Sequence, residues 1–142
     1  GRRVEGPTGP PRLSYAGGVL RQDYIGRLIE QLTQALARAA KLAREGQPSE
    51  AEAELALAEQ ALALPRGIEL FDARSAALVI GSGDKVVLAA LMLEHRAIVL
   101  EAKGDGRGAK QHKKRACALL DHARPHELAS EAAELRARLE QG

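Results

Sequence analysis

Histidines and acidic residues gather in the last third of the sequence, where they could hold a metal ion. They are His112, His122, His126, Asp121 and Glu127. Two histidines four residues apart bind zinc when one helix places them on the same face. Pro125 interrupts any helix between His122 and His126, so these two side chains do not share a face. We therefore expect solvated or helix-capping histidines, no metal site and no cofactor.

Two further motifs could do chemistry. Glu94 and His95 could form an acid–base pair, but neighbouring residues of a helix point about 100° apart and cannot act on one proton. The segment GSGDK at residues 81–85 could hold a phosphate, but it lacks the P-loop spacing and a preceding strand. A turn between helices explains it better. No Ser–His–Asp or Cys–His arrangement is apparent, so we expect no catalytic activity.

Charge is distributed unevenly along the chain. The formal net charge is +2, and residues 1–18 carry that excess with three arginines and one glutamate. The remainder is neutral, which gives no general argument for binding nucleic acid or membranes. Residues 45–65 hold five glutamates and no basic residue, whereas residues 103–124 are basic. The basic patch within the latter segment comprises Lys110, Lys113, Lys114 and Arg115.

This opposition of charge has more than one interpretation. Both faces can simply be solvated. Alternatively they dock, either between copies of the protein or with an acidic partner on the basic helix. Nonspecific anion or nucleic-acid binding through residues 107–123 is a further alternative. No aromatic side chain accompanies the lysines for base stacking, so we do not expect nucleic acid as the main partner.

The lone cysteine and the apolar segments bear on location. Cys117 excludes an internal disulfide and, beside alanine and leucine, is typical of a buried apolar side chain in a reducing compartment. The most apolar stretch, residues 76–100, is split at residues 81–85, and neither half reaches the about 20 apolar residues of a membrane span. No secretory signal is visible. We expect a cytoplasmic protein that does not contact membranes.

The composition predicts one all-α domain. Alanine, leucine and charged residues dominate and aromatic residues make up only 2%, so intrinsic preference favours helix. Residues 1–18 are rich in glycine and proline and are expected to be an irregular tail. Because a strongly patterned helix follows directly, we expect Val19 to be the natural start and residues 1–18 to be upstream or added sequence. Residues 19–142 then form a single helical domain.

Apolar residues at steps of three and four predict about six helices in an antiparallel array. Ser49 is a plausible N-cap for the second helix and Asp72 for the third, and Pro125 suits the first turn of the sixth. The six are expected from Arg21 to Gly46, from Ser49 to Pro65, over 72–80, from Ser82 or Asp84 to about Lys103, over 107–123, and from about Pro125 onward.

A pattern of one glycine and two alanines, G-x4-A-x6-A, occurs twice. Its two copies, 58 residues apart, are Gly46, Ala51 and Ala58, then Gly104, Ala109 and Ala116. The match extends back into the preceding helix through Ala39 and Leu42 in one copy and Ala97 and Leu100 in the other. Small residues let the two helices of a hairpin cross closely, and glycine allows the backbone of the turn. The sequence thus predicts two helical hairpins.

Both hairpins resemble the tetratricopeptide repeat, which places small residues, glycine and paired alanines at these positions. The sequence departs from that repeat where Arg38 and Arg96 replace leucine, and where 58 residues replace a period of about 34. The resemblance implies a protein- or peptide-binding scaffold with a groove on the inner surface of the first and fourth helices. It assigns to that groove Thr33, Ala37, Ala40, Arg44, Glu94, His95, Ile98 and Glu101. A self-associating structural protein is the alternative.

A second resemblance concerns RQDYIGRLIEQL, residues 21–32. This segment is similar to the opening of a family of small bacterial helical proteins of unknown function, in which D-Y-I-x-R-x-I-E-Q begins the first helix. The matching residues are Asp23, Tyr24, Ile25, Arg27, Ile29, Glu30 and Gln31. The resemblance supports Val19 as the start and implies no activity.

Overall fold

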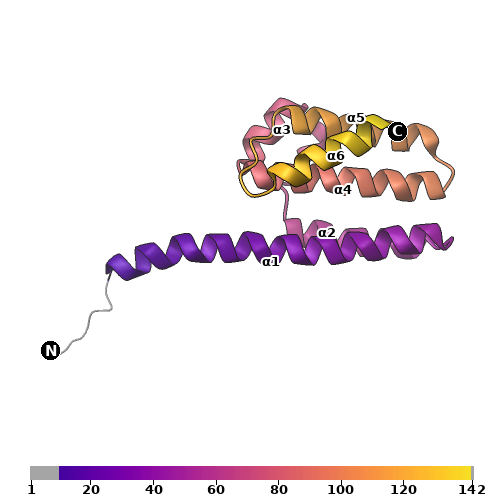
Figure 1. Cartoon of the computed structure of the whole chain (residues 1–142). Coiled ribbons are helices and arrows are strands. Elements are labelled where there is room, and N and C mark those ends of the chain that lie inside the picture. Colours follow the sequence, from indigo (N-terminus) through magenta and orange to yellow (C-terminus); the bar gives the residue numbers. More distant parts are fainter. Residues whose placement is uncertain (1–9, 142) are drawn as a thin grey trace.

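The computed structural model describes residues 10–141, and side chains from Tyr24 onward. Within that range every regular element is a helix, so the predicted all-α array of about six helices is confirmed. The elements are α1 (Pro10–Arg44), α2 (Pro48–Leu62), the short 3-10 helix η1 (Ile68–Leu70), α3 (Ala73–Ile80), α4 (Gly83–Ala102), α5 (Gly106–Asp121) and α6 (Ala129–Gln141) (Figure 1). None of the described helices is both long and apolar enough to cross a membrane.

The helices pack as two antiparallel hairpins, α1 with α2 and α4 with α5, followed by α6 (Figure 1). Helix α4 packs against both α1 and α2, and α6 packs against both α4 and α5. Helix α3 lies against α4 and α5. Helices α4 and α6 therefore each rest on both helices of the hairpin before them.

The repeated glycine and alanines lie where the sequence predicts. Ala51 and Ala58 in α2, and Ala109 and Ala116 in α5, are all buried. The turns begin at Gly46 with φ 79° and Gly104 with φ 88°, a left-handed conformation that favours glycine. The two hairpins differ in one respect, because Ala51 belongs to the contiguous core whereas Ala109 is buried outside it.

The N-terminal part of α1 differs from the expected irregular tail. The helix begins at Pro10, so residues 10–18 are helical, while residues 1–9 lie outside the described range. Proline is compatible with a first helical turn, because the N–H groups there have no acceptor within the helix. Pro10 and Pro11 are therefore no barrier to a helix that begins at residue 10. In Figure 1 this part of α1 projects beyond the end of α2.

Two other boundaries were predicted wrongly or shifted. Helix α2 begins at Pro48 and is preceded by Gln47, so Ser49 is not its cap. Helix α6 begins at Ala129, and Pro125 lies in the loop before it instead of in its first turn. The fifth helix runs from Gly106 to Asp121, close to the predicted 107–123.

The late start of α6 follows from a contact with the start of α4. The buried carboxylate of Asp84 accepts hydrogen bonds from the backbone N–H groups of His126 at 2.8 Å, Glu127 at 3.1 Å and Leu128 at 3.1 Å. These groups therefore face Asp84 in the loop that leads into α6. Burial raises the pKa of Asp84, but the three hydrogen bonds outweigh it and hold the pKa below its ordinary value.

The segment GSGDK is a helix-to-helix turn in which Ser82, Gly83 and Asp84 each make a different structural contact. The Ser82 side chain accepts the N–H of Lys85 at 3.3 Å and caps α4. A Cβ on Gly83 would lie only 1.9 Å from the carbonyl oxygen of Arg124, so only glycine allows this approach. Asp84 then holds the loop that precedes α6. We call Gly83, Asp84 and residues 124–128 the Asp84 latch.

Candidate functional site

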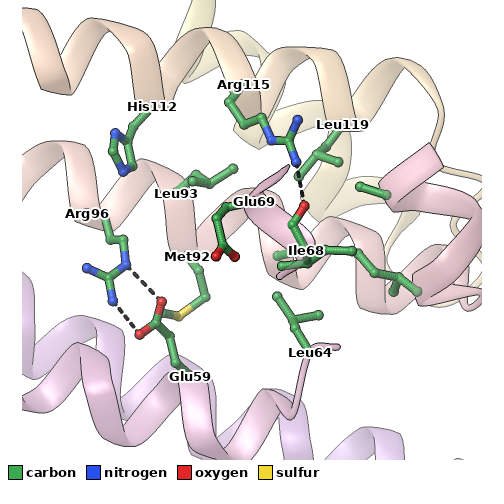
Figure 2. A pocket seen from close by; sticks show the side chains of 13 residues that line it. Glu59, Leu64, Ile68, Glu69, Met92, Leu93, Arg96, His112, Arg115 and Leu119 are labelled. Atoms are coloured by element: carbon green, nitrogen blue, oxygen red, sulfur yellow. Dashed lines mark hydrogen bonds and ion pairs between the residues drawn. The ribbon is translucent and has the colours of Figure 1, made fainter. Parts of the chain in front are cut away.

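A cleft of about 320 Å³ opens where the two hairpins meet the connector between α2 and α3 (Figure 2). We call it the junction cleft. Most of its lining is apolar and comes from α3, α4, α5 and the connector. These apolar residues are Leu64, Ile68, Ala76, Ile80, Ala89, Met92, Leu93 and Leu119. A cavity of this size can accept a large apolar side chain or a small ligand.

Polar side chains surround the apolar floor of the junction cleft. Arg96 of α4 forms a two-bond ion pair with Glu59 of α2, with its Nε 2.9 Å from the nearer carboxylate oxygen (Figure 2). Arg115 of α5 donates to the carbonyl oxygen of Ile68 at 3.1 Å and so holds the connector against α5. Glu69 also points into the cleft in Figure 2. Two arginines and two glutamates line the cleft, which therefore has no strong preference for one sign of charge.

His112 is a further polar residue of this lining. It lies on α5, and its Nδ1 is 2.9 Å from the carbonyl oxygen of Gly108. A carbonyl oxygen only accepts, so this contact requires an N–H at Nδ1. The predicted solvated or capping role describes this residue only in part, since it lines a cleft.

Large apolar side chains on the same connector and on α3 are exposed to solvent. Leu70 is 86% exposed and Leu78 is 74% exposed, and Phe71 and Val79 are also exposed. None of these four lines the cleft, but Leu70 and Phe71 directly follow its lining residues Ile68 and Glu69 on the connector, whereas Leu78 of α3 lines a separate pocket. An exposed apolar pair on a segment that walls a cleft is characteristic of interaction sites.

The sequence contains a signal for this site that its helical patterns obscure. Residues 68–71 read I-E-L-F, and they include one of only three aromatic residues in the chain. The segment lies between helices that already have complete apolar stripes. Apolar residues in a connector are not needed for the packing of a helix stripe. Their presence at residues 68–71 could therefore have indicated the site.

The predicted groove on the inner surface of α1 and α4 is partly filled by α6. A small cleft of about 140 Å³ remains between these three helices, and Thr33 lies in it with Ile29 and Leu91. The other α1 residues assigned to the groove do not line this cleft. Of these, Ala40 is half-buried, and Ala37 and Arg44 are exposed.

On α4 the predicted groove residues are engaged within the chain. Glu94 is 8% exposed and forms a two-bond ion pair with Arg138 of α6, at 2.8 and 3.0 Å. His95 donates from Nδ1 to the carbonyl oxygen of Leu91, and burial lowers the pKa of the His95 ring. Ile98 is half-buried, and exposed Glu101 pairs with Lys113 of α5. The structure therefore does not bring these eight residues together on one open surface.

The predicted basic patch on α5 is divided between two faces. Arg115 turns toward the connector and the junction cleft. Lys110, Lys113 and Lys114 instead line a groove between α5 and α6, together with Arg107. Arg115 directly follows two lysines in the sequence, but consecutive residues of a helix point in different directions.

The two arginines that depart from the repeat pattern both reach α2. Arg38 pairs with Glu54 at 3.0 Å within the first hairpin. Arg96 pairs with Glu59, and Lys103 pairs with Glu52 at 2.9 Å, so these two ion pairs join the hairpins. Three of the glutamates in the acidic segment thus have partners inside the chain.

No candidate metal centre is found among the described residues, where no group of three His, Cys, Asp or Glu side chains is placed to hold an ion. The comparisons with known proteins give no relative, because none of the family models, curated proteins or solved structures matches this chain.

Proposed function

We propose that this protein is a binding module that recognises an apolar side chain of a partner polypeptide in the junction cleft. The observation that carries the proposal is the apolar cleft of about 320 Å³, one wall of which is the connector that also exposes Leu70 and Phe71. A small ligand inside the cleft would leave those neighbours exposed. A polypeptide would cover them, because its residues on either side of the buried one extend over the rim.

The charges of the lining support a neutral contact. Glu59 and Arg96 neutralise each other, and Arg115 and Glu69 add one charge of each sign. Apolar contact at the centre and polar groups at the rim is the usual anatomy of a protein interface. The proposal includes no catalytic step.

The only methionine of the chain offers an NMR reporter for this binding. Met92 is the only methionine and lines the floor of the cleft, so its ε-methyl group gives one NMR signal located there. Peptides selected for binding from a random displayed library should carry a large apolar residue and should shift that signal on titration. Selected peptides that leave the Met92 methyl signal unmoved would overturn the proposal.

Exposed leucines provide a matched set of variants. Leu70→Asp changes a side chain of the connector two residues after Ile68, and Leu70 is too exposed to contribute much to the core. This variant should bind the selected peptides about tenfold more weakly or worse. Leu57 of α2 is 59% exposed and does not line the cleft, so Leu57→Asp should bind as the unchanged protein does. Equal weakening by both variants would contradict the assignment.

A further inference from the structure

The groove between α5 and α6 combines positive charge with an apolar floor. Its volume is about 420 Å³, and its α5 residues follow helical steps of three and four along one face. The lining comprises Arg107, Lys110, Gln111, Lys113, Lys114 and Cys117 from α5, with Leu139 from α6. This surface is separate from the junction cleft, with which it shares no lining residue.

The positive charge of this groove is mostly uncompensated within the chain. Lys113 lies 3.3 Å from a carboxylate oxygen of Glu101. Among the ion pairs formed by described side chains, none involves Arg107, Lys110 or Lys114. Three cations on one face attract an acidic partner and discriminate against a basic one.

The floor of the groove shows that charge alone does not describe its occupant. Cys117 is half-buried and Leu139 is buried, and the aliphatic stems of the lysines extend the apolar surface around them. An apolar side chain of the partner would gain from contact with this floor. A nucleic-acid backbone has no such group, and none of the lining residues is aromatic for base stacking.

The order of the array indicates the form of the occupant. Helix α4 rests on α1 and α2, and α6 rests on α4 and α5. A helix seated between α5 and α6 would continue the same arrangement. An acidic amphipathic helix therefore fits the shape, the charge and the apolar floor together.

A second copy of the chain is a poorer occupant. Its acidic helix is α2, but Glu52, Glu54 and Glu59 of that helix already pair with Lys103, Arg38 and Arg96 of their own chain. Docking α2 into the groove of another molecule would require those pairs to be broken or shared.

We propose that the groove between α5 and α6 binds an acidic amphipathic helix of another protein, with one apolar side chain of that helix seated on Cys117 and Leu139. This inference goes beyond the proposed function, because it assigns a second surface and a partner of different chemistry.

Cys117 is the only cysteine and makes the groove directly measurable. The full chain is mixed with a synthetic helical peptide that carries leucines at steps of three and four between glutamates. Binding is followed by fluorescence anisotropy and by the rate at which iodoacetamide alkylates Cys117. The peptide should bind, should slow alkylation, and should weaken in affinity as salt is added.

Comparison peptides separate the two parts of the recognition. Replacing the glutamates by lysines tests the charge, and replacing the leucines by serines tests the apolar contact. Each replacement should weaken binding about tenfold or more. Equal affinity of either comparison peptide would overturn the proposal, as would tighter binding of a single-stranded oligonucleotide. Protection of Cys117 that rises with protein concentration alone would assign the groove to a second copy instead.

Variants with equal changes of charge locate the contact. Lys110→Glu with Lys114→Glu alters two exposed residues of the groove and should weaken binding about tenfold. Arg27→Glu with Lys41→Glu makes the same change of charge on exposed positions of α1 and should leave binding unchanged. The Leu70→Asp variant should also bind this peptide normally. The two proposed sites can therefore fail independently.

Discussion

The two hairpins share one spacing of glycine and alanine but use their charges differently. In the first hairpin, glutamates of α2 pair with Arg38 of α1, with Arg96 of α4 and with Lys103, the residue that follows α4. In the second, Arg107, Lys110 and Lys114 of α5 face a groove with no carboxylate partner among the described side chains. The same spacing of glycine and alanine thus accompanies ion pairs between the hairpins in one case and an unpaired basic surface in the other.

The hairpins also differ in how their first helices are fixed. Helix α4 begins at the Asp84 latch, where three N–H groups of the loop before α6 bind one carboxylate. The N-terminal part of α1 instead projects past the end of α2 in Figure 1. The second hairpin therefore contacts the loop before α6 at the start of α4, and α6 itself along its length. Variants of the Asp84 latch should show how much the contact at the start of α4 contributes to stability.

The largest effect is expected for Asp84→Ala. This change leaves three backbone N–H groups without their acceptor, one of them buried and two partly buried, and it should lower the free energy of unfolding by about 3 kcal/mol. Urea denaturation followed by circular dichroism measures the change. Asp105 provides the control, since it caps α5 through a single bond from the N–H of Gly108 at 2.8 Å. Asp105→Ala should cost about 1 kcal/mol, and equal costs would contradict the special role of Asp84.

Overpacking of the matched alanines should separate the two hairpins further. Ala51 of α2 lies in the contiguous core, where α1, α2 and α4 all pack against one another. Ala51→Leu should therefore destabilise the protein by about 2 kcal/mol. Ala109 is buried outside that core, close to the turn at residues 103–105, and the exposed residues 101–107 around that turn can adjust more easily than a core contact. Ala109→Leu should therefore cost about 1 kcal/mol. Urea denaturation of both variants tests the order, and the reverse order would show that the second hairpin is the more tightly packed.

Such local features are the part of the fold that the sequence predicts well. The steps of three and four and the small residues beside a glycine act within one hairpin, so the helices and the burial of Ala51 and Ala109 follow from them. The start of α6 was missed because its loop binds Asp84, about forty residues earlier in the chain. The preference of Pro125 for a first helical turn could not reveal that competing contact.

The site was harder to predict for the same reason. The junction cleft exists because the connector folds against α5, where Arg115 holds the carbonyl oxygen of Ile68, 47 residues away. The predicted groove, in contrast, relied on open inner faces of α1 and α4, and Arg138 of α6 reaches Glu94 there. Nothing in the spacing of either helix indicates which neighbour will cover it.

A smaller effect concerns the pH dependence of stability. Burial is the main cause that lowers the pKa of His95, and it outweighs the raising effects of the Leu91 carbonyl and of Glu94, while Arg138 lowers the pKa further. The folded state therefore binds a proton less readily than the unfolded state, whose histidines titrate near 6.5. Stability should be constant above that pH and should fall as the pH drops below it.

The change His95→Gln tests this assignment. Urea denaturation between neutral pH and pH 5 should show a decline in the unfolding free energy of the unchanged protein, and a shallower decline in the variant. NMR titration of the His95 ring should give a midpoint below the ordinary value. A variant with the same decline would place its origin elsewhere in the molecule.

The smallest effects are expected for the ion pairs that distinguish the first hairpin. In the pair of Arg96 with Glu59 the side chains are 32% and 45% exposed, and in the pair of Arg38 with Glu54 they are 54% and 22% exposed. Exposed pairs of this kind contribute about 0.2–1 kcal/mol. Double-mutant cycles with Arg96→Met and Glu59→Gln, and with Arg38→Met and Glu54→Gln, should give couplings in that range that decrease with added salt.

A coupling above about 2 kcal/mol would mean that the charges of the first hairpin hold the array together. The expected low value has a different consequence. Burial of Ala51 and Leu55 then keeps α2 in place, and the Arg96–Glu59 pair instead sets the polar end of the junction cleft. Breaking that pair should therefore alter the affinity for a peptide in the cleft more than it alters stability, whereas breaking the Arg38–Glu54 pair, which lies outside the cleft, should alter neither by much.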